Sequence, residues 1–258
     1  MRLAANLSML FGEFGFLDRF EAAAAAGFTA VEYLFPYEYS PTELAGRLEA
    51  NGLSQALFNL PAGDWAAGDR GLACLPECTE EFREGVGLAV EYASALGCKT
   101  VNALAGIAPA GSDPGRHTAT LVENLAFAAE ELSGQGIRLV TEPINTIDIP
   151  GFFLTNTSQA RGVVEQVGSD NLLIQYDAYH MQIMEGDLAR TIEHNFGLIG
   201  HVQIADNPGR HEPGTGEINY PFLLRHLDRL GYEGFVGCEY RPAAGTVEGL
   251  DWAKEHLG

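Results

Sequence analysis

Short apolar runs alternate along the whole chain with longer stretches in which apolar residues recur every three or four positions. Gly, Pro or Asn bound many of the short runs, as is typical of strands. The longer stretches, such as 80–97 and 120–136, have the period of amphipathic helices. The pattern predicts eight strands, at residues 2–7, 28–34, 53–58, 100–104, 137–142, 172–177, 199–205 and 234–239.

Glycines end several predicted helices just before the next strand, and this punctuation recurs along the chain. They are Gly27, Gly52, Gly97, Gly136 and Gly231. No linker or change of composition interrupts the repeat, so we expect one domain over residues 1–258. Eight strands, each followed by a helix, close naturally into a (β/α)8 barrel of the α/β class. The alternative, an open doubly wound sheet, would need a Gly-rich phosphate turn after an early strand, and the sequence has none.

Acidic residues outnumber basic ones, with 35 Asp and Glu against 15 Lys and Arg and a formal charge of −20. Such a field repels phosphate backbones, so we do not expect nucleic acid as a partner. The N-terminal segment has no charged leader followed by an apolar core, and no apolar run reaches about 18 residues. We therefore expect a cytoplasmic protein that is neither secreted nor embedded in a membrane.

The four cysteines include no CxxC pair, and free thiols are the default interpretation. Cys74 and Cys78 could instead form a loop disulfide or half of a zinc site, which we keep as the alternative. The two lysines, Lys99 and Lys254, do not fall where a barrel keeps its active groups, so Schiff-base chemistry is not expected.

Oxygen-bearing side chains stand at or near the ends of four consecutive predicted strands, in the segments LVTEP, IQYD, HVQIAD and FVGCEY. They are Glu142, Asp177, Gln203 and Glu239. Taken singly, each is more often a rim charge or a helix cap, but a barrel gathers the ends of all its strands at one face. Three carboxylates and an amide favour Mg²⁺ or Mn²⁺ over zinc or copper, which prefer nitrogen and sulfur. The sequence thus predicts a divalent-metal enzyme site.

One histidine lies close to this predicted site. His180 follows Asp177 by three residues and could orient a substrate hydroxyl. The alternative is a histidine at a helix start that bonds only to the backbone. We expect most of the other histidines considered to face solvent: His117, His194, His211, His226 and His256.

Two long loops, 59–80 and 206–220, are predicted on the same face, and the first has the composition of a lid. An acidic substrate needs local positive charge in so acidic a protein, and a guanidinium binds a carboxylate through two hydrogen bonds. We therefore predict that Arg70 and Arg210 bind substrate, with Trp65 beside them, the alternative being solvated loop arginines.

Aromatic residues follow the second predicted strand, at Tyr33, Phe35, Tyr37 and Tyr39. Three interpretations stay open for them: a wall of the pocket, a contact in a homo-oligomer, or packing of loops on the barrel rim. The segment GTGE at 214–217 suggests a phosphate site, but no Gly-rich turn leads directly into a helix there, so a phosphosugar substrate is disfavoured.

The chain resembles the hydroxypyruvate isomerase family, a branch of the xylose-isomerase-like TIM barrels that also contains ketose 3-epimerases and sugar-acid isomerases. The resemblance covers residues 2–242 and rests on the stretches ANLSMLFGE, FNLPAGDWAAGDRG, EPIN, YDAYHMQ, HVQIADNPGRHEPGTGEINY and GCEY. It implies metal ligands at Glu142, Asp177, Gln203 and Glu239, with Glu142 and Glu239 also serving as the acid/base pair. The third ligand is usually histidine in the epimerases, so Gln203 favours the isomerase branch.

The implied reaction interconverts hydroxypyruvate and tartronate semialdehyde. It removes a proton next to a carbonyl, passes through an enediolate and returns the proton to the neighbouring carbon, which a divalent ion and two carboxylates can support. A 2-oxo-tetronate isomerase acting on a four-carbon sugar acid is the nearest alternative, and a ketose 3-epimerase is a weaker one. A metal-dependent nuclease would require several histidine ligands and a basic face, and a non-catalytic sugar-acid binder is a further alternative.

Overall fold

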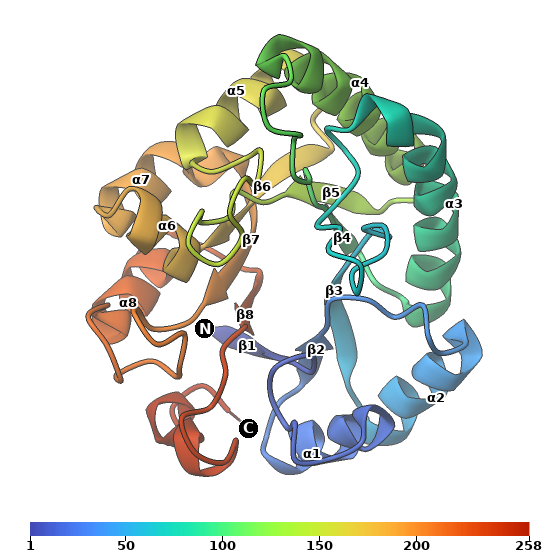
Figure 1. The fold of residues 1–258 in the computed structure, drawn as a ribbon. Coiled ribbons are helices and arrows are strands. Elements are labelled where there is room, and N and C mark those ends of the chain that lie inside the picture. Colours follow the sequence, from blue (N-terminus) through green and yellow to red (C-terminus); the bar gives the residue numbers. More distant parts are fainter. Residues whose placement is uncertain (258) are drawn as a thin grey trace.

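The computed structural model describes residues 1–257, which form a closed barrel of eight parallel strands in chain order (Figure 1). The strands are β1 (Arg2–Asn6), β2 (Ala30–Glu32), β3 (Ser54–Asn59), β4 (Thr100–Ala103), β5 (Arg138–Thr141), β6 (Leu172–Asp177), β7 (Ile199–Ile204) and β8 (Phe235–Cys238). Parallel pairing of β8 with β1 closes the ring. The predicted barrel is confirmed, although most strands are shorter than predicted.

Helices surround the barrel as an outer layer (Figure 1). The α-helices of the described residues are α1 (Arg19–Ala25), α2 (Pro41–Asn51), α3 (Thr79–Leu96), α4 (Pro114–Ser133), α5 (Thr157–Val167), α6 (Ala178–Met184), α7 (Leu188–Asn195) and α8 (Tyr220–Leu230). Short 3-10 helices are η1 (Phe16–Asp18), η2 (Pro76–Cys78), η3 (Phe196–Leu198) and η4 (Glu248–Ala253). The expectation of one helix per strand is wrong in two units, since two α-helices follow β6 and, up to residue 257, only η4 follows β8.

The helix boundaries follow from local chemistry. The side chain of Ser40 caps α2 by accepting a hydrogen bond from the amide of Glu43 at 3.2 Å, and Pro41 occupies the first turn. At the other end Gly52 is left-handed, with φ of +63°, and its amide bonds to the last carbonyls of the helix. The other four predicted glycine stops also have positive φ. Gly97 and Gly231 directly cap their helices as Gly52 does, whereas α1 and α4 end at Ala25 and Ser133, before Gly27 and Gly136.

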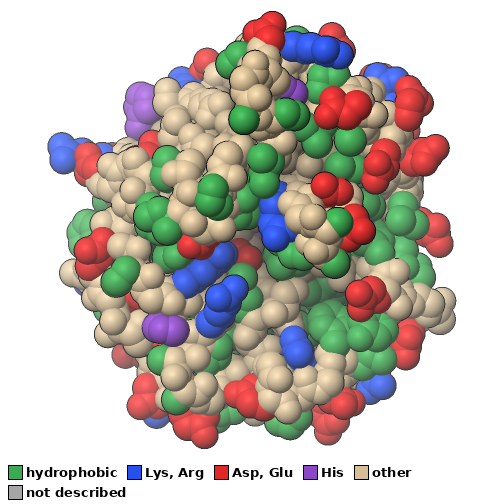
Figure 2. All heavy atoms as spheres, in the orientation of Figure 1, with side chains coloured by type: hydrophobic (Ala, Val, Ile, Leu, Met, Phe, Trp, Pro, Cys, Tyr) green, Lys and Arg blue, Asp and Glu red, His purple; other side chains and the backbone are tan. Residues whose placement is uncertain are grey.

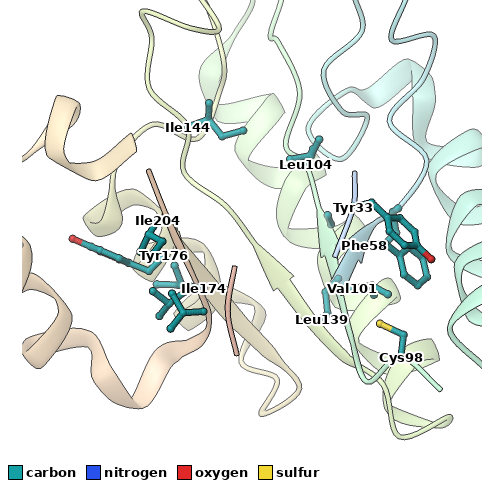
Figure 3. Packing of buried hydrophobic residues seen from close by; sticks show 14 of the residues in the cluster. Tyr33, Phe58, Cys98, Val101, Leu104, Leu139, Ile144, Ile174, Tyr176 and Ile204 are labelled. Carbon is teal, nitrogen blue, oxygen red and sulfur yellow. The ribbon is translucent and has the colours of Figure 1, made fainter. Parts of the chain in front are cut away.

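Apolar side chains fill the space between the strands and the helices. Figure 3 shows two groups of these residues, one around Phe58, Val101 and Leu139 and the other around Ile174 and Tyr176. All five are buried, as expected for strands that pack helices on their outer side. This apolar layer holds the strand ends, and therefore the rim of the barrel, in fixed positions.

The interior of the barrel, in contrast, contains hydrogen-bonded polar side chains. Glu32 on β2 bonds to His201 and Gln203 on β7, and these strands are not neighbours in the ring. Such bonds must therefore cross the barrel interior. Asn102 on β4 belongs to the same buried polar class.

Two further expectations concern cysteines and membranes. Cys74 and Cys78 are free thiols, as are Cys98 and Cys238, so the default interpretation is confirmed and the disulfide alternative is wrong. Within residues 1–257, no helix is both long and apolar enough to cross a bilayer.

The aromatic series after β2 packs on the rim, the third of the three interpretations. Tyr33 is buried against Phe16, and Tyr39 stacks on the same ring with centroids 5.1 Å apart. Tyr37 donates a hydrogen bond to the carbonyl oxygen of Asn59 at 2.8 Å. Phe35 differs from the others, because it contacts the lid residue Trp65.

Candidate active site

Six of the residues predicted from sequence line one cavity of about 740 Å³ at the end of the barrel where the strands finish. They are Trp65, Arg70, Glu142, His180, Arg210 and Glu239. Figure 2 shows this face of the molecule, hollowed near its centre, with basic side chains at the edge of the hollow. Asp177 and Gln203 are buried more deeply, with at most 1% of their surface exposed.

The three predicted carboxylates come from separate strands. Asp177 ends β6, whereas Glu142 and Glu239 directly follow β5 and β8 instead of being their last residues as predicted. Ligand atoms of Glu142, Asp177 and His180 all lie within 4.8 Å of one another. Nη2 of Arg210 is 3.4 Å from Oε1 of Glu239 and 4.0 Å from Oδ2 of Asp177. The barrel thus gathers these groups into one cluster.

Burial and mutual repulsion raise the pKa values of these carboxylates. Burial, followed by the charges of Glu239 and Asp177, holds the pKa of Glu142 well above its ordinary value. Burial likewise raises the pKa of Glu239 to about 8 and that of Asp177 to about 6, while the positive charge of Arg210 opposes both shifts. A cation bound among them would relieve the same repulsion.

Asp177 has one oxygen committed to the fold and one that is not. Its Oδ1 caps α6 by accepting hydrogen bonds from the amides of Tyr179 at 2.7 Å and His180 at 3.4 Å. Its Oδ2 is buried and has no hydrogen-bond partner among residues 1–257. An unpaired buried oxygen is costly, so this atom fits a role as a ligand of a divalent cation.

Asn145 fixes the tautomer of His180. Oδ1 of Asn145 accepts hydrogen bonds from the amides of Ile147 and Asp148, so its Nδ2 must face Nδ1 of His180, which lies 2.6 Å away. Nδ1 is then an acceptor, and the hydrogen is on Nε2, 3.6 Å from Asp177 and 3.8 Å from Glu142. Burial also holds the pKa of His180 well below its ordinary value.

A neutral His180 in this tautomer donates a hydrogen bond from Nε2 and offers no lone pair there. It therefore suits a substrate oxygen better than a cation, although it lies close enough to Glu142 and Asp177 to complete a metal-binding group. Asn145 was not identified as a site residue from the sequence, even though it ends the EPIN motif.

Gln203 lies within β7, beside Asp177 in the strand register. Its Nε2 donates to Oε1 of Glu32 at 2.7 Å, and its Oε1 accepts from Nε2 of Gln175 at 2.5 Å. The amide of Gln203, the predicted third ligand, is therefore held at both ends. Sequence reasoning did not identify Glu32, because the predicted strand at 28–34 placed this carboxylate inside the strand, whereas β2 ends at Glu32.

Arg210 reaches into the site from the loop that follows β7. Its φ of +53° is rare for a side-chain-bearing residue. Nη1 lies 3.2 Å from Oδ2 of Asp148, and the guanidinium sits 5.1 Å from the ring centre of Tyr179. The predicted substrate arginine is therefore fixed in place by the loop after β5 and by α6.

The lid residues form one wall of the cavity. Arg70 lies over the ring of Trp65, 4.3 Å from its centre, and donates to the carbonyl oxygens of Trp65 at 3.0 Å and Asp69 at 2.6 Å. The loop is anchored to the β4 loop by the bridge between Gly71 and Ala105. Arg70 is thus part of an ordered wall that lines the cavity.

Asn102 is a second contact of Glu142 that the sequence did not reveal. Its Nδ2 donates to Oε2 of Glu142 at 3.2 Å and to Oδ1 of Asn59 at 3.1 Å. Because Asn102 lies near the end of its strand, the rule that identified the carboxylates could have found it.

The expectation that His117 faces solvent is wrong. This side chain is buried and bonds to the carbonyl oxygen of Cys74 at 2.7 Å.

The amides of GTGE are occupied within the protein. Gly214 and Gly216 donate to Oδ2 of Asp206 at 2.8 and 2.9 Å, and Ile218 donates to Oδ1 at 3.0 Å. These donors are therefore engaged by a carboxylate of the chain, which gives a second reason to disfavour a phosphosugar substrate.

Comparison with known proteins defines the class. The family model described as "Xylose isomerase-like TIM barrel" matches residues 20–256, and the chain belongs to this family. It is an isomerase of that family. The 2-oxo-tetronate isomerase of Cupriavidus necator is 54% identical over 257 residues, covering 100% of this chain and 99% of the relative. The hydroxypyruvate isomerase of Escherichia coli is 56% identical over 252 residues, covering 98% of each chain.

A solved structure superposes on this chain along its whole length. It is the AP endonuclease, family 2 from Brucella melitensis, which is 47% identical with a TM-score of 0.98, covering 100% of this chain and 99% of that one. These three similar proteins thus carry two isomerase names and one nuclease name.

Proposed function

We propose that the protein interconverts hydroxypyruvate and tartronate semialdehyde by moving a proton between adjacent carbons of the substrate. The observation that carries this proposal is the pair of buried carboxylates, Glu142 and Glu239, which line the same cavity and hold raised pKa values. A carboxylate such as Glu239, whose pKa is raised to about 8, can both accept and return a proton near physiological pH. One glutamate acts as the base and the other as the acid, with their order unassigned.

We further propose that Glu142, Asp177, Gln203 and Glu239 would hold Mg²⁺ or Mn²⁺. The oxygen-only donor set supports a hard divalent ion, as does the unpaired buried Oδ2 of Asp177. Bound there, the ion supplies electrophilic stabilisation of the negative charge that develops on the substrate as the proton leaves.

The remaining side chains bind and orient the substrate. Arg210 has Nη2 directed at the carboxylate cluster and can pair with the carboxylate of a small acid. His180 offers its Nε2 hydrogen to a substrate oxygen. Arg70 and Trp65 close the cavity on the lid side and keep water from the reacting carbons.

A four-carbon substrate, 2-oxo-tetronate, is the second candidate. Two observations favour it: a relative with that name is 54% identical over the full chain, and a cavity of about 740 Å³ is larger than a three-carbon acid requires. A ketose 3-epimerase is less well supported, because Gln203 stands where that branch usually has histidine.

We also propose that the protein is cytoplasmic and does not act on nucleic acid, despite the nuclease title of one relative. Four free thiols suit a reducing compartment, and a charge of −20 opposes an approach to DNA. Incubation with a duplex that carries an abasic site is expected to give no strand cleavage, and cleavage that needs Glu142 would contradict this part of the proposal.

Exchange of the transferred hydrogen with D₂O tests the central proposal. With Mn²⁺ present, the protein is expected to introduce deuterium into hydroxypyruvate, and Glu142→Gln and Glu239→Gln should each lower the rate at least 100-fold. Asn171→Ala is the matched control, because Asn171 bonds to Ala129 and Ile137 ahead of β6, at the opposite end of the barrel. Undiminished exchange in both glutamine variants would remove the carboxylates from proton transfer.

A substrate panel separates the two candidates. Purified protein with bound metal determined by elemental analysis is assayed on hydroxypyruvate, on 2-oxo-tetronate and on free ketoses. The substrate with the larger kcat/KM identifies how many carbons the natural substrate has. Activity on ketoses alone would contradict both proposed substrates.

A further inference from the structure

Glu32 is a buried carboxylate that the proposed reaction does not use. It lies at the end of β2 inside the barrel, and none of its surface is exposed. Its Oε1 accepts from Asn6 at 3.1 Å and from Gln203 at 2.7 Å, and its Oε2 lies 2.8 Å from Nε2 of His201. Three side chains from two other strands therefore converge on one carboxylate.

Strand β8, which is separated from β2 only by β1, makes room for this carboxylate. A Cβ atom built on Gly237 of β8 would overlap both carboxylate oxygens of Glu32. Gly237 is paired with Gln203 in the register of β7 and β8, so the space it leaves lies next to the Gln203 side of the network. The close approach of Glu32 to Gln203 thus depends on a glycine at this position.

An amide such as that of Gln203 can present either its oxygen or its nitrogen to a neighbour, and only the oxygen binds a cation. A carboxylate accepts hydrogen bonds and donates none, so Glu32 can face only the NH₂ group of Gln203. Oε1 must then point to the other side, where Gln175 occupies one of its two lone pairs.

We infer that Glu32 is a positioning residue that selects the metal-binding orientation of the Gln203 amide. The inference rests on the proposed role of Gln203 as a ligand. Glu32 acts through Gln203 and touches neither substrate nor cation. Neighbours that orient a ligand by hydrogen bonding commonly change metal affinity about 10- to 100-fold when they are replaced.

The first test is Mn²⁺ affinity, measured by the electron paramagnetic resonance signal of the free ion. Glu32→Gln keeps the size of the side chain but can donate as well as accept, so Gln203 loses its fixed orientation. We expect Mn²⁺ to bind about 10- to 100-fold more weakly to this variant. Asn171→Ala, which loses two hydrogen bonds far from the site, is expected to bind Mn²⁺ as the unaltered protein does.

A double-mutant cycle separates positioning from the loss of a negative charge. If Glu32 acts only through its negative charge, its removal lowers the affinity for a nearby cation by the same factor whether or not Gln203 is present. If Glu32 acts through Gln203, then Glu32→Gln has no further effect on Mn²⁺ affinity once Gln203→Leu is in place. Equal losses in the two backgrounds would overturn the inference and leave the proposed ligand set intact. An unchanged affinity in Gln203→Leu would overturn both the inference and the ligand role of Gln203.

Gly237→Ala approaches the same contact from the partner strand and covers the case in which Glu32→Gln fails to fold. The added methyl displaces the Glu32 carboxylate while leaving its charge in the barrel. We expect weaker Mn²⁺ binding than in the unaltered protein, and no additional loss when Gln203→Leu is present. Wild-type Mn²⁺ affinity in folded Gly237→Ala would contradict the inference.

Discussion

Single hydrogen bonds set the chemical state of the side chains in this site. Asn145 decides which nitrogen of His180 carries the hydrogen, and the helix-capping bonds of Asp177 leave its other oxygen free. Neither effect depends on the identity of the reactive residue alone. The same Asp or His in another environment would have a different protonation state and a different role.

Replacing Asn145 with Asp is expected to reverse the His180 tautomer. A carboxylate at this position can accept but not donate, so Nδ1 of His180 would become the protonated nitrogen. The substrate would then lose the Nε2 hydrogen bond, and kcat/KM is expected to fall about 100-fold. Steady-state kinetics and ¹⁵N NMR of the imidazole measure the two consequences. An unchanged kcat/KM with a reversed tautomer would exclude His180 as a donor to the substrate.

Arginine substitutions test recognition of the substrate carboxylate. Arg210→Ala is expected to lower kcat/KM about 10- to 100-fold, mostly through KM, because a hydrogen bond between charged groups is lost. Arg70→Ala should have a smaller effect, since Arg70 already bonds to its own loop. Arg225→Ala, on the exposed side of α8, is the control. If Arg70→Ala and Arg210→Ala both leave the kinetics with hydroxypyruvate unchanged, the assignment of these arginines is wrong.

At the level of elements, the loop after β7 is organised around one buried carboxylate. Asp206 accepts hydrogen bonds from the amides of Asn207, Gly214, Gly216 and Ile218, and the loop presents Arg210 to the site. Length and composition predicted this loop and its arginine. They did not show that Asp206, three residues after Gln203, is a structural centre and not a ligand.

Asp206→Ala is expected to loosen this loop. Losing a buried charged acceptor with four amide donors should lower the free energy of unfolding by about 3 kcal/mol and raise KM, since Arg210 loses its support. Urea denaturation and steady-state kinetics measure the two effects. The exposed Asp170, replaced by Ala, serves as the control. Unaltered stability of Asp206→Ala would show that the loop is held by other contacts.

Across the whole molecule, the barrel concentrates negative charge that the solvent cannot screen. In the metal-free protein, the raised pKa values of Asp177, about 6, and Glu239, about 8, mean that the folded state holds protons that the unfolded state releases. This contribution to stability is complete below about pH 4. It is lost as the pH rises through 6 and then 8.

A divalent ion competes with the same protons, so its affinity should change with pH in the opposite sense. We expect Mn²⁺ affinity to rise between pH 5 and 9, by up to about 10-fold per pH unit for each proton displaced. Melting temperatures with Mn²⁺ and with a chelator, at several pH values, measure both trends. An affinity independent of pH would show that the carboxylates which bind the ion are already ionised in the metal-free protein.

The sequence by itself determined the eight strands, the glycine stops and the positions of Glu142, Asp177, Gln203 and Glu239, because hydrophobic period and strand-end polarity are local signals. Only the tertiary structure decided which partners these residues meet. Glu32 reaches Gln203 across the barrel, and Asn145 reaches His180 from a neighbouring loop. These hydrogen bonds join residues far apart in sequence, which come together only when the barrel closes. No local sequence pattern predicts such contacts.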